Sequence, residues 1–102
     1  MAKAIRFDEV GGPEVMQYVD IDVPSPAAGQ VQVRHTAAGL NYIDTYHRTG
    51  LYPLPLPSGI GLEAAGVVEE VGDGVANLKA GDRIAYGAGP LGAYSERANV
   101  PA

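Results

Sequence analysis

The sequence has no cysteine, and only 7 of its 102 residues are lysine or arginine. Without cysteine the chain cannot form a disulfide, a thiolate metal site or a cysteine nucleophile. A formal net charge of −5, with the basic residues scattered, argues against binding to nucleic acid and against an electrostatic membrane anchor. No signal peptide and no apolar run of membrane-spanning length is present, so we expect a cytoplasmic protein.

Glycine and proline are plentiful instead, with 14 and 8 copies that separate short segments rich in Val, Ile and Tyr. This punctuation is typical of a mostly β domain with many turns, and the length fits one domain. The expected strands cover residues 3–7, 16–23, 31–38, 61–72, 82–87 and 92–100. With one short helix among them, they predict a small, partly open β-barrel.

The helix is expected at residues 41–48, where the alternation of the strands breaks down. Asn41 is a good N-cap, Asp44 three residues later resembles a capping box, and Gly50 is a plausible stop. The following segment, 50–59, contains three prolines in five residues and is expected to be an extended loop.

Residues 37–53 hold the densest set of polar and aromatic side chains. A tyrosine offers a ring that stacks on a flat ligand and a hydroxyl that donates a hydrogen bond. Tyr42 and Tyr46 are four residues apart, as on a helix face that packs on the core, and we expect this packing for Tyr42. For Tyr46 and Tyr52 the spacing leaves packing and ligand binding open. Locally, Asn41 needs no role beyond capping the helix.

The two histidines invite a metal hypothesis that the spacing does not support. His35 and His47 lie on different elements with no clear third ligand, so no metal site is expected. We expect His35, in phase with Val31 and Val33, to be a hydrogen-bonded core residue, and His47 to lie on the surface. The sequence also has no GxGxxG, P-loop or GxSxG motif.

The stretch GLEAAGVV, residues 61–68, places a carboxylate, Glu63, among small and apolar residues. A carboxylate in apolar surroundings usually requires a partner or has a function. The sequence therefore predicts that Glu63 has either a hydrogen-bonding partner or a function.

Three stretches together carry a family resemblance: AAGLNYIDTYHRTGLYP, PSGIGLEAAGVVEEVGDGV and KAGDRIAYGAGPLGAYSE. They are similar to the N-terminal half of medium-chain dehydrogenases/reductases, in the zinc-free quinone oxidoreductase branch related to zeta-crystallin. The resemblance implies that residues 1–102 form the GroES-like catalytic domain of an alcohol dehydrogenase-like enzyme. Its partner would be a Rossmann domain of the same parent chain, absent from this sequence, so little activity is expected from these residues alone.

The resemblance also implies that the metal has been lost. Zinc-dependent members have a cysteine ligand where this chain has Asn41 and a histidine ligand where it has Leu62, and neither replacement suits zinc. Glu63 matches a glutamate close to the family's metal position. It is therefore expected at the floor of the active-site cleft in a structural, hydrogen-bonding role, with small neighbours that let the cofactor half approach closely.

By the same resemblance, Asn41, Tyr46 and Tyr52 are the expected catalytic residues. The nicotinamide-ribose end of NADPH would lie along Asn41, Tyr42, Ile43, Asp44, Thr45 and Tyr46. The implied reaction is metal-free hydride transfer to a quinone, which needs orientation and a donor for the developing oxyanion. The parent enzyme would be a homodimer.

Two alternatives remain. A zinc-free reductase of conjugated enones or enoyl thioesters would share this domain and its cofactor. A stand-alone GroES-like module without enzymatic activity would not need the set Asn41, Tyr46 and Tyr52.

Overall fold

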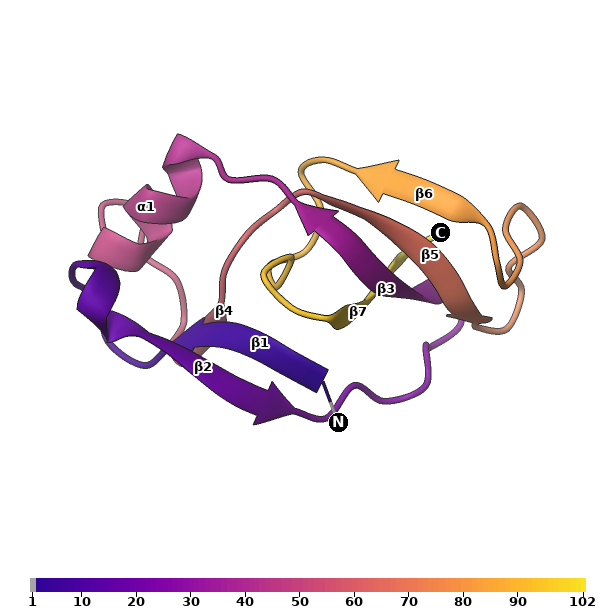
Figure 1. Cartoon of the computed structure of the whole chain (residues 1–102), viewed down its shortest axis with the longest axis horizontal. Helices are drawn as coiled ribbons and strands as arrows, with labels where there is room; N and C mark the ends of the chain where they lie inside the picture. The colour runs from indigo at the N-terminus through magenta and orange to yellow at the C-terminus, as the bar shows by residue number, and fades with distance from the viewer. Residues whose placement is uncertain (1) are drawn as a thin grey trace.

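The structure, a computed structural model, describes residues 2–102. In chain order the elements are β1 (Ala2–Phe7), the 3-10 turn η1 (Pro13–Val15), β2 (Met16–Ile21), β3 (Gln30–Ala38), α1 (Tyr42–Thr49), β4 (Ser58–Gly59), β5 (Ala64–Val71), β6 (Arg83–Tyr86) and β7 (Arg97–Pro101). The prediction of a mostly β domain with one short α-helix is confirmed (Figure 1).

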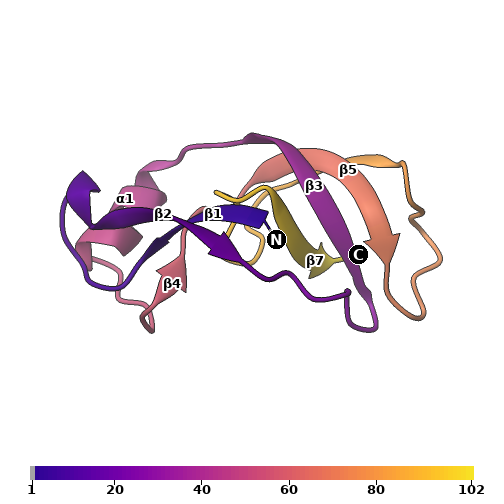
Figure 2. The ribbon, with the colours of Figure 1, turned by 60° about the horizontal axis from the view of Figure 1, so that its bottom comes forward.

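The strands form two antiparallel sheets, and the helix lies at one end of the molecule (Figures 1 and 2). The first sheet has the order β2-β1-β4 and the second has the order β6-β5-β3-β7. A bridge between Ala4 and Ser95 joins β1 to the segment before β7. The backbone N–H of Ile5 also donates to the Tyr94 carbonyl at 2.8 Å. The sheets are therefore coupled along β1, close to the start of the chain.

The core of the four-stranded sheet consists of valines that alternate with more exposed residues. Val31, Val33, Val68 and Val100 are all at most 3% exposed and pack together. Because side chains of a strand alternate between its two faces, Val31 and Val33 lie on the same face of β3. The predicted alternation in this strand is confirmed.

Helix α1 begins and ends where its sequence signals predict. The Asp44 carboxylate accepts a hydrogen bond from the Asn41 backbone N–H at 3.1 Å, and Gly50 ends the helix in the left-handed conformation with φ of 86°. At the C-terminal end, the Gly11 N–H donates to the Arg48 carbonyl at 2.9 Å, which attaches the helix to the turn before η1. Within residues 2–102, no helix is long and apolar enough to cross a membrane.

Two predicted strands start later than expected. The strand expected at residues 61–72 begins only at Ala64, because Gly61 has φ of 97° and turns the chain out of the extended conformation. The strand expected at residues 92–100 begins only at Arg97, because the preceding residues form the loop that crosses to β1.

Close packing inside the domain explains two of the small residues in GLEAAGVV. A Cβ atom added to Gly61 would lie 2.6 Å from the Tyr94 ring, and one added to Gly66 would collide with the Arg34 backbone carbonyl in the neighbouring strand β3. These two contacts lie within residues 2–102, so they require no approach of another domain.

Replacing Gly66 with alanine is expected to lower the free energy of unfolding by about 1–3 kcal/mol, because the backbone of β3 must move to make room. Urea unfolding measures this difference. Gly87→Ala is the matched control, because a Cβ there meets nothing within 4 Å and its φ is not positive. Equal stability of the two variants would contradict the packing argument.

Candidate functional site

The first half of α1 holds the residues that the sequence predicts for the site. Asn41, Ile43, Thr45 and Tyr46 are half-buried, whereas Asp44 is only 2% exposed. The Thr45 hydroxyl donates to the Tyr42 carbonyl at 2.6 Å and is thus used within the helix. The helix therefore offers a ligand the side chains around Asp44 but not Asp44 itself.

Tyr42 is 82% exposed, so the expectation that it packs on the core is wrong. The helix directs Asp44 and His47 inward instead, and these two residues are three positions apart on the same face. The inward face is thus polar, and the aromatic face points outward.

Tyr46 and Tyr52 lie together although a turn separates them in the sequence. Their ring centroids are 5.4 Å apart at an interplanar angle of 75°, and the Tyr52 N–H donates to the Tyr46 carbonyl at 3.2 Å. We call Tyr42, Tyr46 and Tyr52 the tyrosine surface. Within residues 2–102 none of their three hydroxyls has a hydrogen-bond partner, so all three can donate to a ligand.

Exposed leucines flank the tyrosine surface. Leu40 is 79% exposed and Leu51 is 64% exposed, at the two ends of the helix. Together with the exposed Tyr42 and Tyr52, they give this end of the molecule four exposed large apolar or aromatic side chains within residues 40–52.

Tyr86 uses its hydroxyl inside the domain. Tyr86 donates to His35 Nε2 at 2.9 Å, which leaves His35 Nδ1 as the donor to the Ser95 carbonyl at 2.8 Å. His35 is therefore hydrogen-bonded at both ring nitrogens, as predicted. Burial raises the pKa of the Tyr86 hydroxyl.

His47 is 8% exposed, so its predicted surface position is wrong. It shares the inward face of α1 with Asp44, and its Nδ1 atom has no hydrogen-bond partner within residues 2–102. No three His, Asp or Glu side chains of the described residues lie where they could hold a metal ion together.

Glu63 is exposed, because it lies just before β5 and not within the strand. Its carboxylate borders a hollow of about 400 Å³ beside Ala37, Ala38 and Gly39. Among residues 2–102 this carboxylate has neither a hydrogen bond nor an ion pair. Small side chains, among them Ala37, Ala38 and Ala85, line the same hollow, so the immediate surroundings of Glu63 are apolar as predicted although the residue is exposed. A structural hydrogen-bonding role for Glu63 stays a prediction.

The pair of buried Asp44 and half-buried Tyr94 was not predicted from the sequence. The Tyr94 hydroxyl donates to Asp44 Oδ2 at 2.5 Å, across a separation of 50 residues. Burial, then the hydrogen bond to Asp44 and the charge of Asp44, raise the pKa of Tyr94 well above its ordinary value of 10.0. The capping-box spacing indicated Asp44, but no local signal indicates that Tyr94 reaches it.

Comparison with known proteins agrees with the fold. Residues 27–102 match the family of the alcohol dehydrogenase GroES-like domain. The chain is 59% identical over 97 residues to a quinone oxidoreductase of Pseudomonas aeruginosa, covering 94% of this chain and 30% of that protein. It is also 45% identical over 107 residues to a 2-haloacrylate reductase of Burkholderia sp., covering 100% of this chain and 32% of that protein.

Comparison with a solved structure also agrees with the fold. The quinone oxidoreductase of Escherichia coli, solved in complex with NADPH, matches with a TM-score of 0.95 at 52% identity, covering 97% of this chain and 31% of that chain. The chain thus spans about a third of the length of the relatives that it matches.

The raised pKa of Tyr94 predicts a loss of stability at alkaline pH. In the unfolded chain Tyr94 releases its proton near pH 10, whereas the folded protein retains it. The contribution of Tyr94 is therefore complete below about pH 10 and decreases as the pH rises further. Urea unfolding of wild type and Tyr94→Phe from about pH 8 to pH 11 measures the effect, and the two stabilities should converge as the pH rises. Parallel curves would contradict it.

Proposed function

The chain belongs to the alcohol dehydrogenase GroES-like domain family, and we propose that it is the catalytic domain of an NADPH-dependent quinone reductase. It is homologous to the N-terminal part of quinone oxidoreductases, one of which was solved with NADPH. Because the chain spans about a third of their length, the proposal includes a second, dinucleotide-binding Rossmann domain in the full-length protein. Activity would require both domains.

The observation that carries the proposal is the tyrosine surface. Tyr42 and Tyr52 are 82% and 51% exposed, and Tyr46 contacts Tyr52. Exposing aromatic rings to water is unfavourable, whereas a flat ligand that stacks on them gains both buried area and directed hydrogen bonds. A quinone and a nicotinamide ring both have this flat shape.

The first half of α1 fits the nicotinamide-ribose end of NADPH in the chemistry of its side chains. Asn41 offers an amide, Tyr42 and Tyr46 offer rings whose hydroxyls have no partner among residues 2–102, and Ile43 and Thr45 are half-buried between them. When bound, NADPH would supply the hydride from C4 of its nicotinamide ring. Asp44 would not contact the cofactor directly, because its side chain lies on the inward face of α1 and is too deeply buried to touch a ligand.

The proposed chemistry of the protein is orientation and hydrogen-bond donation. A quinone is already electrophilic, and its reduction places negative charge on an oxygen atom. The Asn41 amide and the hydroxyls of Tyr46 and Tyr52 can donate to that oxygen. The final proton would come from solvent or from one of these tyrosines. Leu62 and Asn41, at the positions of two zinc ligands in related enzymes, would take no part in metal binding.

A reductase of conjugated acids or ketones is the second candidate, and one observation favours it. The Burkholderia relative, at 45% identity, is named for 2-haloacrylate, in which a carbon–carbon double bond is conjugated to a carboxylate. Hydride addition to such a compound also develops charge on an oxygen. The same donors would serve both reactions.

The test is NADPH oxidation by the full-length protein with a panel of quinones and with 2-haloacrylate. Turnover of the quinones alone would support the first candidate, and turnover of 2-haloacrylate alone would support the second. No turnover of either compound would contradict both.

Within the active protein, Asn41→Ala and Tyr52→Phe are each expected to lower kcat/KM for the quinone by about tenfold or more, because each removes a proposed donor. Tyr18→Phe is the matched control, because Tyr18 is also exposed, at 70%, but lies on β2 outside the tyrosine surface. Unchanged kinetics in the first two variants would show that the site assignment is wrong.

A further inference from the structure

We propose that Tyr94 is a positioning residue, whose hydroxyl holds Asp44 and thereby fixes the first turn of α1 and the placement of Asn41 and Tyr46. The catalytic consequence rests on the proposed function. The hydrogen bond from Tyr94 to Asp44, which we call the tether, does not rest on the proposed function, because it concerns only the geometry of the helix.

One carboxylate oxygen makes the connection. Asp44 Oδ2 accepts the Tyr94 hydroxyl at 2.5 Å and the Asn41 backbone N–H at 3.1 Å. The side chain of a distant loop and the residue that begins the helix are therefore bonded to the same atom. A shift of the Tyr94 hydroxyl would be transmitted directly to Asn41.

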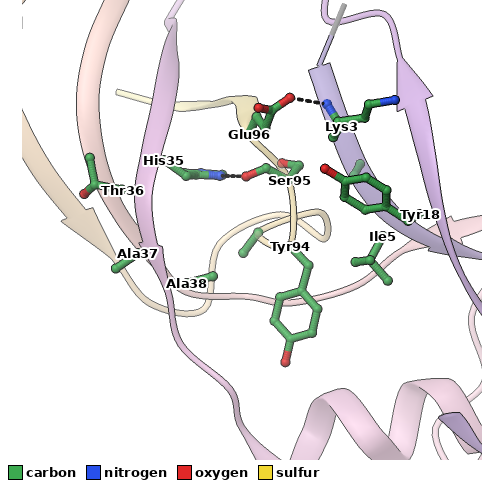
Figure 3. A pocket seen from close by; sticks show the side chains of 12 residues that line it. Lys3, Ile5, Tyr18, His35, Thr36, Ala37, Ala38, Tyr94, Ser95 and Glu96 are labelled. Atoms are coloured by element: carbon green, nitrogen blue, oxygen red, sulfur yellow. Dashed lines mark hydrogen bonds between the residues drawn. The ribbon is translucent and has the colours of Figure 1, made fainter.

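Tyr94 is itself attached to the body of the domain. Its N–H donates to the Ile60 carbonyl at 3.0 Å, its carbonyl accepts from the Ile5 N–H at 2.8 Å, and its ring packs on Gly61. Figure 3 shows Tyr94 on the same segment as Ser95, with its ring directed away from His35 and its hydroxyl toward the helix. Because Ile60 is only 2% exposed and Ile5 lies in β1, this anchor belongs to the packed, hydrogen-bonded part of the fold.

Among the hydrogen bonds of residues 2–102, the bond from Tyr94 is the sole attachment of the first turn of α1 to the rest of the domain. The last turn is held by Arg48, through its backbone carbonyl and through its Nε atom, which donates to the Gly11 carbonyl at 3.2 Å. Within residues 2–102, the bond from Tyr94 to Asp44 is the one hydrogen bond that joins residues 41–45 to a residue outside the helix. The proposed catalytic end of the helix thus depends on a single tether.

The burial of Asp44 makes this tether strong. Asp44 is 2% exposed, and its other oxygen, Oδ1, has no partner within residues 2–102. A buried carboxylate that loses a donor is costly, so the chain is expected to move until the carboxylate regains a donor or water. Without the Tyr94 hydroxyl, that movement would displace the first turn of α1.

Such a displacement matters because donors to a developing oxyanion must be placed to within a fraction of an ångström. A misplacement of about 1 Å can lower a rate by about a hundredfold, even when its cause lies away from the reacting atoms. Substrate binding by stacking on rings tolerates more movement. Loss of the tether should therefore lower kcat more than it changes KM.

The experiment compares Tyr94→Phe with Tyr86→Phe in the full-length protein. Both variants delete one hydroxyl from a half-buried tyrosine that donates to a side chain, but the partner of Tyr86 is His35 in the sheet. We expect Tyr94→Phe to lower kcat by about tenfold to a hundredfold with KM for the quinone within about threefold. Tyr86→Phe should stay within about twofold in both constants, even where thermal unfolding shows a comparable loss of stability.

A double-mutant cycle tests whether the effect passes through Asp44. Once Asp44→Ala has removed the acceptor, adding Tyr94→Phe should lower kcat no further. Multiplying effects would overturn the proposal, and so would equal kinetics of Tyr94→Phe and Tyr86→Phe. If Tyr94→Phe does not fold, Asp44→Ala is compared with Tyr86→Phe by the same criteria.

A spectroscopic measurement separates the tether from the proposed function. The amide resonance of Asn41 reports its hydrogen bond to Asp44, and it should shift in Tyr94→Phe but not in Tyr86→Phe. If the wild-type protein reduces neither a quinone nor 2-haloacrylate, the proposed function fails while this resonance still decides the tether. An Asn41 amide that does not move in Tyr94→Phe would overturn the inference.

Discussion

A buried carboxylate at the start of the helix is the constraint on which the rest of the candidate site depends. Asp44 is a negative charge removed almost completely from water, and two donors at one oxygen compensate it. One donor is the local backbone of Asn41, and the other is Tyr94 from a loop 50 residues away. A local capping interaction thus becomes a long-range connection between the helix and the loop before β7. The outward direction of Tyr42 follows from the inward direction of Asp44, because residues two positions apart lie on different faces of a helix.

The tyrosines divide into groups by what their hydroxyls do. Tyr86 and Tyr94 donate to side chains inside the domain, and burial is the largest cause that raises the pKa of each. The hydroxyls of the tyrosine surface have no partner within residues 2–102. An amphipathic residue can serve either purpose, because its ring packs while its hydroxyl needs a donor or acceptor role. The first group links segments that are far apart in the sequence, and the second leaves donors for a ligand.

Local sequence signals predicted the bounds of the helix. Which face of the helix points inward depends on contacts with residues far along the chain. Asn41, Asp44 and Gly50 act on their own neighbourhood, so the bounds of α1 follow from the sequence. The inward face was not predictable, because Tyr42 and His47 both suit either environment and the choice is made by a bond to a residue far along the chain. The position of Glu63 was mispredicted for a related reason: the apolar composition around it predicted a strand that includes this residue, but the turn at Gly61 delays the strand until Ala64.

Exposure by itself does not identify a site, as a comparison within this domain shows. Tyr18 is 70% exposed, yet it lies alone on β2 with the Lys3 ammonium 5.6 Å from its ring centroid. The tyrosine surface differs in that two of its rings lie on a helix whose position is fixed from inside, and the third, Tyr52, contacts Tyr46 from the segment that follows. Hydride transfer to an electrophile requires placement more than acid strength, so the useful combination is a rigid support with unpaired donors on its outer side. Within residues 2–102 this combination occurs where α1 meets the segment that follows it.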